Sequence, residues 1–133
     1  MTVVLVDASA AVEYLLRTDL GQRVEVLLYD ARLMAPELLD AEVLAVLRRE
    51  VLAGRLRATR AGEAVQDLHD WGVERIAHRA LLSEAWKLRG HVSAYDALYV
   101  AAARLHHATL LTADGPLARA RGLGVAVQNV RLQ

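Results

Sequence analysis

The chain has 133 residues, 55% of them hydrophobic, which is enough for one domain (residues 1–133) with a substantial buried core. Lys plus Arg and Asp plus Glu each number 16, so no net charge attracts the protein to nucleic acid or to an anionic membrane, and a site for a polyanion would have to be a local patch. The sequence has no Cys, which excludes disulfides and thiolate metal sites.

The first predicted element is a strand over residues 3–6, which is apolar on both faces, as in the middle of a parallel sheet that helices cover. Asp7 follows it directly, at the end of the strand where α/β sheets bind their ligands. Alternatively, Asp7 or Ser9 is simply the N-cap of the helix that begins at Ala10. Because no basic leader precedes this segment and Asp7 and Glu13 interrupt it, we expect neither a signal peptide nor a membrane span, and hence a cytoplasmic protein.

Helical periodicity, capping residues and glycines divide the rest of the chain into further helices and short apolar strands. Gly21 is interpreted as the break between the first two helices, and Gly54 as the stop of the longest one. Ser93 followed by Asp96 matches a capping box at the start of a nearly wholly apolar helix, which we expect in the middle of the domain. The predicted helices span residues 10–17, 22–31, 37–53, 59–71, 78–89, 93–106 and 117–121, and the further strands 33–35, 73–76, 109–112 and 124–127.

Strands that alternate with helices predict a three-layer α/β domain, with a central parallel sheet of four or five strands flanked by about seven helices. Asp7 and Asp114 each follow a predicted strand, so both should lie at the same edge of this sheet. Asp96 lies in the first turn of the apolar helix, where a carboxylate is costly unless it is neutral, capped or bound to a cation. Capping together with Ser93 explains Asp96 without any further function.

A further acid is predicted on an apolar helix face, at either Asp40 or Glu42. Each has apolar neighbours at helical spacing, so periodicity alone does not choose between the two. Both are also explained by the helix dipole, which favours acids early in a helix.

At these residues the chain resembles the PIN-domain ribonucleases and, within them, the VapC toxins of bacterial toxin–antitoxin pairs. The matching segments are VLVDASA (residues 4–10), DAEV (40–43), YDALYVAAA (95–103) and LLTAD (110–114). The resemblance spans the whole length, implies a PIN-like fold, and favours Glu42 over Asp40. It implies an acidic site of Asp7, Glu42, Asp96 and Asp114, with Ser9 and Thr112 in supporting positions.

Four carboxylates gathered in this way repel one another strongly, and a divalent cation resolves the conflict. Carboxylates suit Mg²⁺, for which Mn²⁺ can substitute. The resemblance thus implies a metal-dependent endoribonuclease that cleaves RNA phosphodiester bonds, with Asp7 and Asp96 as its firmest metal ligands. It also implies a homodimer and a cognate antitoxin that covers the acidic site.

Three other functions remain open from the sequence: a PIN nuclease of ordinary RNA processing, a Mg²⁺-binding receiver domain, and a non-catalytic binding module. A receiver needs an acceptor Asp after its third strand and a Lys near its last, whereas here Ala77 and His78 follow the third strand and Lys87 is the only lysine.

Contacts to RNA have weaker signals. The six Trp and Tyr residues are too scattered in sequence for a base-stacking platform, although Tyr95, beside Asp96, could face RNA. Arginines cluster around the end of the longest helix, where they form either a solvated helix end or a phosphate contact: Arg48, Arg49, Arg55, Arg57 and Arg60.

Overall fold

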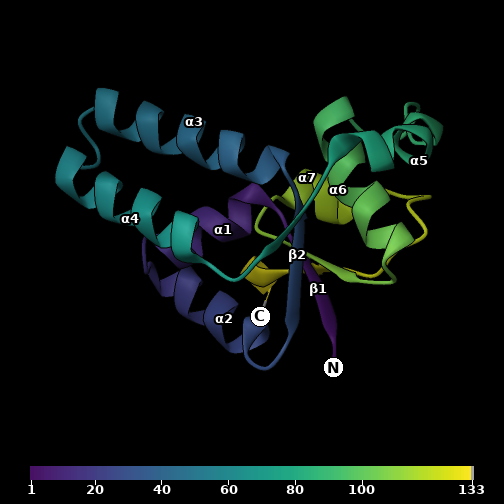
Figure 1. The fold of residues 1–133 in the computed structure, drawn as a ribbon, viewed down its shortest axis with the longest axis horizontal. Helices are drawn as coiled ribbons and strands as arrows, with labels where there is room; N and C mark the ends of the chain where they lie inside the picture. The colour runs from purple at the N-terminus through teal and green to yellow at the C-terminus, as the bar shows by residue number, and fades with distance from the viewer. Residues whose placement is uncertain (133) are drawn as a thin grey trace.

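A computed structural model describes residues 1–132, which form a five-stranded parallel sheet with helices on both faces (Figure 1). The strands are β1 (Val3–Val6), β2 (Arg32–Pro36), β3 (Glu74–Ile76), β4 (Thr109–Thr112) and β5 (Val127–Asn129). The α-helices are α1 (Ala8–Leu15), α2 (Asp19–Leu28), α3 (Leu38–Leu52), α4 (Ala58–Asp70), α5 (Leu82–Lys87), α6 (Ala94–Leu105) and α7 (Gly115–Arg119). Two 3₁₀ helices are η1 (His78–Leu81) and η2 (Val130–Leu132). The predicted three-layer α/β fold is confirmed.

The strands are ordered β3-β2-β1-β4-β5, with β1 in the centre. All neighbouring pairs are parallel, with Val4 opposite both Leu33 of β2 and Thr109 of β4. Receiver domains have the order 2-1-3-4-5. The observed order therefore excludes the receiver alternative.

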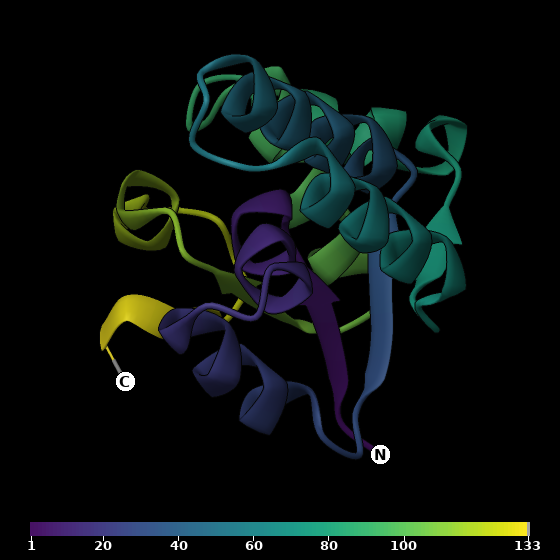
Figure 2. The same cartoon turned by 90° about the vertical axis from the view of Figure 1, so that its left-hand side faces the viewer.

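Helices on the two sides of the sheet build two separate cores. Val4 and Val6 of β1 pack against α1 to α4, whereas Leu5 packs against α5, α6 and α7, because successive side chains of a strand point to opposite faces. This double burial explains why β1 is apolar at every position. Figure 1 shows α3 and α4 side by side, extending away from the sheet, and Figure 2 shows the same pair from its outer side.

Helix α6 lies across β1, β2 and β4, as expected for a helix without a polar stripe. Its residues from Tyr99 to Ala103 are all buried. No helix within residues 1–132 is both long and apolar enough to cross a membrane.

The predicted break at Gly21 is wrong, because Gly21 lies inside α2. The chain turns instead at Arg17, which has a φ of 56°, and Thr18 caps α2 by accepting a hydrogen bond from the Gly21 N–H at 2.9 Å. A Cβ atom on Gly21 would come within 2.0 Å of the Glu13 carbonyl oxygen. The glycine therefore permits the close contact of α1 with α2 and does not end a helix.

Two other predicted boundaries are corrected. The helix expected over residues 78–89 is divided into η1 and α5. The last strand, expected over residues 124–127, begins only at Val127, because Gly122 and Gly124 turn the chain with φ values of 77° and 70°. By contrast, the stop at Gly54 is confirmed, with a φ of 75° directly after the last turn of α3. The ends of the other helices differ from expectation by one to three residues.

Candidate active site

The Asp7 carboxylate lies at the carboxyl end of β1, and only 5% of the residue is exposed. Its Oδ1 atom accepts hydrogen bonds from the Ser9 hydroxyl at 2.7 Å and from the Ala10 backbone N–H at 3.0 Å. Its Oδ2 atom accepts a hydrogen bond from the Thr112 hydroxyl. Asp7 is thus the N-cap of α1, as one of the two interpretations predicted, and it is held at both carboxylate oxygens.

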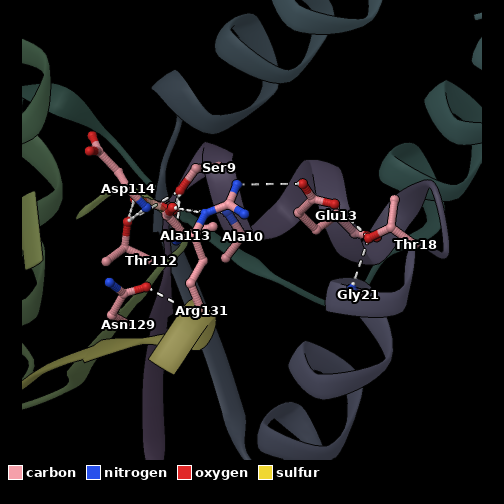
Figure 3. A network of polar contacts seen from close by, with 11 residues as sticks. Ser9, Ala10, Glu13, Thr18, Gly21, Thr112, Ala113, Asp114, Asn129 and Arg131 are labelled. Atoms are coloured by element: carbon pink, nitrogen blue, oxygen red, sulfur yellow. Dashed lines mark hydrogen bonds and ion pairs between the residues drawn. The ribbon is translucent and has the colours of Figure 1, made fainter. Parts of the chain in front are cut away.

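Ser9 and Thr112 connect the end of β1 to the turn after β4 (Figure 3). Their hydroxyl oxygens are 3.2 Å apart. The Ser9 Oγ accepts a hydrogen bond from the Ala113 N–H at 2.9 Å, and the Thr112 Oγ1 accepts one from the Asp114 N–H, also at 2.9 Å. The same two hydroxyls therefore hold the Asp7 carboxylate and the backbone from which Asp114 projects.

Burial raises the pKa of Asp7 from 3.8 to about 6, because the charged carboxylate loses its water. Hydrogen bonds from Thr112, Ala10 and Ser9 lower this pKa, and repulsion from Asp114 raises it further, but desolvation is the largest effect. The ionised form of Asp7 is therefore disfavoured in this pocket, which is the condition that a cation relieves.

Two more of the predicted acids lie at helix N-termini. Asp114 is the N-cap of α7, and its Oδ1 accepts a hydrogen bond from the Leu117 N–H at 3.5 Å. Asp96 lies in the first turn of α6, and its N–H donates to the Ser93 hydroxyl at 3.2 Å, which confirms the predicted capping by Ser93. Both carboxylates are half-buried, at positions where the helix dipole favours negative charge.

Glu42 and Asp40, which periodicity could not separate, have different surroundings. The Glu42 Oε1 accepts a hydrogen bond of 2.7 Å from the hydroxyl of Tyr99 in α6. Asp40 forms an ion pair with Arg75 instead, with 2.8 Å between Oδ1 and Nη2. Arg75 also donates to three backbone carbonyls of the segment that leads from α4 into β3. Asp40 therefore anchors α3 to this segment, and Glu42 faces α6.

The four acids are coupled electrostatically. Burial raises the pKa of Asp96, and repulsion from Asp114 and then from Glu42 raises it further. Asp114 also repels Asp7. Carboxylates from the β1–α1 junction, α3, α6 and the β4–α7 turn thus lie within electrostatic range of one another, at the carboxyl end of the sheet.

The donors that these residues offer are all carboxylate oxygens, which suit Mg²⁺ or Mn²⁺ in preference to softer metals. Their mutual repulsion is of the kind that a bound cation offsets. In the described part of the chain, however, no three Asp, Glu or His side chains are close enough together to hold a metal ion as they stand. The donor chemistry fits a divalent ion, and three-point coordination requires the half-buried carboxylates to move closer.

Two further residues of this region were not predicted as site residues. Tyr99, one of the six scattered Trp and Tyr residues, is 2% exposed, and burial followed by its contact with Glu42 raises its pKa far above the usual range. Its hydroxyl consequently remains a hydrogen-bond donor. Arg131 of η2 donates from Nε to the Ala113 carbonyl at 2.8 Å and lies 3.9 Å from Glu13, bracing the turn before Asp114 (Figure 3).

A hollow of about 920 Å³ lies elsewhere, between α1, α2 and α4. The stacked rings of Tyr14 and Trp71, with centroids 4.7 Å apart, form part of its wall. None of the four predicted acids is among the described residues that line it.

Comparison with known proteins yields a consistent set of relatives. The family model described as "PIN domain" matches residues 4–123. The chain is 40% identical over 129 residues to Ribonuclease VapC1 of Mycobacterium tuberculosis, covering 96% of this chain and 97% of that protein. Among solved structures, PAE2754 from Pyrobaculum aerophilum is similar with a TM-score of 0.71 and 19% identity, over 98% of this chain and 91% of that one. VapBC2 from Rickettsia felis, solved bound to a DNA fragment from its promoter, has a TM-score of 0.58 and 17% identity, over 96% and 98%.

Proposed function

The chain belongs to the PIN-domain family and, within it, to the VapC ribonucleases, and on this premise we propose that it is an endoribonuclease that acts as the toxin of a toxin–antitoxin pair. The observation that carries the proposal is the group of mutually repelling carboxylates at the carboxyl end of the sheet. Acids that repel one another lower the stability of the fold, so such a group is typical of a functional site. In phosphodiester hydrolysis, carboxylates of this kind hold the metal ion that assists the reaction.

We propose that Asp7, Glu42, Asp96 and Asp114 hold Mg²⁺, or Mn²⁺ in its place. Their all-oxygen donor set and the raised pKa values of Asp7 and Asp96 support this assignment. When bound, such an ion activates water as a nucleophile and stabilises the negative charge that develops on the phosphate.

The chain's own residues orient these carboxylates. Ser9 and Thr112 donate to opposite oxygens of Asp7 and so fix the plane of its carboxylate. Tyr99 donates to Oε1 of Glu42 and leaves Oε2 free of this contact. The hydrogen bonds from Thr112, Ala10 and Ser9 favour the charged form of Asp7 and partly offset the effect of its burial.

The proposed partners are RNA as substrate, a second copy of the chain, and a cognate antitoxin that covers the acids. Likeness to VapC1 supports the substrate, and likeness to the fold of VapBC2 is compatible with the antitoxin. An RNA substrate and an antitoxin partner would place the activity in the cytoplasm.

The test is cleavage of RNA by the purified protein with Mn²⁺, for the wild type, Asp7→Asn and Asp30→Asn. Asp30 is exposed and has a φ of 56°, which Asn tolerates, so this control removes one carboxylate without disturbing the backbone. We expect Asp7→Asn to lose at least about a hundredfold in cleavage rate, in the range reported for key electrostatic groups. Equal Mn²⁺-dependent cleavage by wild type and Asp7→Asn would refute the assignment.

A further inference from the structure

The chain has no net charge, but its acidic and basic residues are distributed unequally between the two helical layers. Residues 78–129, which include α5, α6 and α7 but not η2, contain 6 of the 16 basic residues and only 3 of the 16 acidic ones. Two of these acids, Asp96 and Asp114, belong to the site already described. The third, Glu84, pairs with Lys87 at 3.2 Å and with Arg104 at 3.2 Å. Apart from the site itself, this layer therefore presents unbalanced positive charge.

Exposed aromatic side chains accompany this charge. Trp86 of α5 is 68% exposed and Tyr95 of α6 is 62% exposed. The Arg89 guanidinium lies over the Trp86 ring, 4.7 Å from its centroid, and Arg89 also donates to the Trp86 carbonyl at 3.0 Å. We define the aromatic–arginine rim as five exposed residues of α5, α6, α7 and the segments after α5 and α7: Trp86, Arg89, Tyr95, Arg119 and Arg121.

The rim borders the acidic site. Tyr95 directly precedes Asp96 at the start of α6, and α5 packs against α6. The Arg119 guanidinium lies so close to Gly115, the residue after Asp114, that a Cβ there would be 2.7 Å from Nη1. The segments before α6 and after α7 also touch, since a Cβ on Gly122 would lie 3.1 Å from the His91 ring.

We propose that the aromatic–arginine rim binds single-stranded RNA and holds it beside the acids, an inference that rests on the proposed function. Guanidinium groups bind phosphates in a bidentate manner, and exposed rings stack on any base, so the two together track a strand without reading its sequence. Carboxylates repel a phosphate backbone, and cations on one side of them offset this repulsion.

The layer of α1 to α4 is less suited to binding RNA. Of the five arginines around the end of α3, Arg55 pairs with Glu50 and Arg60 donates to the Leu15 carbonyl at 2.8 Å, whereas Arg48, Arg49 and Arg57 are exposed. Residues 1–77 contain 13 acidic residues against 9 basic ones. Charge therefore directs a polyanion to the α5–α7 side of the acids.

The test is binding of a fluorescein-labelled, unstructured RNA oligonucleotide to the protein in EDTA, followed by fluorescence anisotropy. The variants are Trp86→Ala and Arg121→Glu, each with a control of equal chemistry on α2 or just after it: Tyr29→Ala, where Tyr29 is 86% exposed, and Arg23→Glu, where Arg23 is also exposed. We expect Trp86→Ala to weaken binding about tenfold, as one lost stacking contact does, and both controls to bind like the wild type. Arg121→Glu should also reduce the salt dependence of log K by at least about 0.7, the value for one phosphate contact to a single strand.

Equal losses in the rim variants and their controls would overturn the inference, as would unchanged affinity in both rim variants. A Trp86→Ala variant that lowers the sedimentation mass and leaves RNA affinity unchanged would assign the rim to a protein interface instead. Because EDTA prevents metal-dependent cleavage, the outcome is separate from that of the proposed function. A protein that binds RNA through the rim but does not cleave it in Mn²⁺ would refute the proposed nuclease alone.

Discussion

The acids of the candidate site fall into two pairs with different degrees of support. Asp7, which follows β1, and Glu42 of α3 each accept a hydrogen bond from a side chain of another element, namely Thr112 and Tyr99. Asp96 and Asp114 are half-buried at the starts of α6 and α7, where Asp114 is the N-cap of α7 and Asp96 lies three residues after Ser93, the N-cap of α6. One half of the site is thus held across the fold, and the other half is held locally. The carboxylates of Asp7 and Glu42 are therefore fixed in position, whereas those of Asp96 and Asp114 can change rotamer when a ligand binds.

This contrast depends on how firmly α3 is attached, which predicts the largest effect on stability. Arg75→Met removes the partner of Asp40 and the donor to three backbone carbonyls, so we expect the free energy of unfolding to fall by about 4 kcal/mol. Urea denaturation measures it. Arg104→Met, which removes an ion pair with Glu84 on the other layer, should cost about 1 kcal/mol or less. If Arg75→Met and Arg104→Met lower the free energy of unfolding by similar amounts, α3 is held no more firmly than the elements of the other layer.

The burial of Asp7 predicts an unusual dependence of stability on pH in metal-free protein. Its pKa rises from 3.8 in the unfolded chain to about 6 on folding, so its stabilising contribution is complete below pH 3.8 and is lost as the pH rises through 6. Asn at this position does not titrate, so Asp7→Asn does not lose this contribution. We therefore expect the free energy of unfolding of the variant to rise relative to that of the wild type between pH 4 and pH 7, by about 3 kcal/mol at most. Unfolding curves in EDTA at these two pH values give the difference. If the difference in free energy of unfolding between the wild type and Asp7→Asn is the same at both pH values, the pKa of Asp7 is not raised by folding.

The hydrogen bond from Tyr99 to Glu42 predicts a smaller effect that is specific to the site. Tyr99→Phe keeps the ring and loses the donor, so we expect about 1.5 kcal/mol less stability and weaker binding of Mn²⁺ in calorimetry. Tyr95→Phe, on the exposed side of the same helix, is the matched control and should change neither. If Tyr99 acts through Glu42, its substitution has no further effect on Mn²⁺ affinity in a Glu42→Gln background. Additive effects on that affinity would show that Tyr99 acts on the site by another route.

The smallest effect is expected at Arg131, which is more than half exposed and braces the turn before Asp114. Arg131→Met should lower the free energy of unfolding by about 0.5 kcal/mol, because a solvated hydrogen bond contributes little. The same urea measurement applies. A loss as large as that of Tyr99→Phe would mean that Asp114 is also held from a distance, which would end the contrast between the two pairs.

Features that a short stretch of sequence specifies were predictable. The apolar run of β1, the acid after it and the Ser93 cap all arise from neighbouring residues, and each lies where the sequence places it. The α/β alternation likewise predicted the layers and the parallel sheet. The sequence alone could not choose between Asp40 and Glu42, because the choice depends on Arg75 and Tyr99, which lie 35 and 57 residues away.

The remaining errors have the same origin. Gly21 satisfies the local rule for a helix break, but the packing of α1 on α2 decides its role. The strand β5 lies at the edge of the sheet, where half-buried Gln128 and Asn129 are tolerated, so an apolar pattern does not mark it. Whether the four acids act together as metal ligands stays a prediction for the experiments above.

The 3.5 Å contact between the Asp114 carboxylate and the Leu117 amide has one more consequence. If the Asp114 carboxylate turns towards a ligand, the Leu117 N–H loses its hydrogen-bond acceptor. Because α7 has only five residues, few other hydrogen bonds hold this helix in place. Deuterium uptake at Leu117 would then report occupancy of the site from a helix that never touches the ligand.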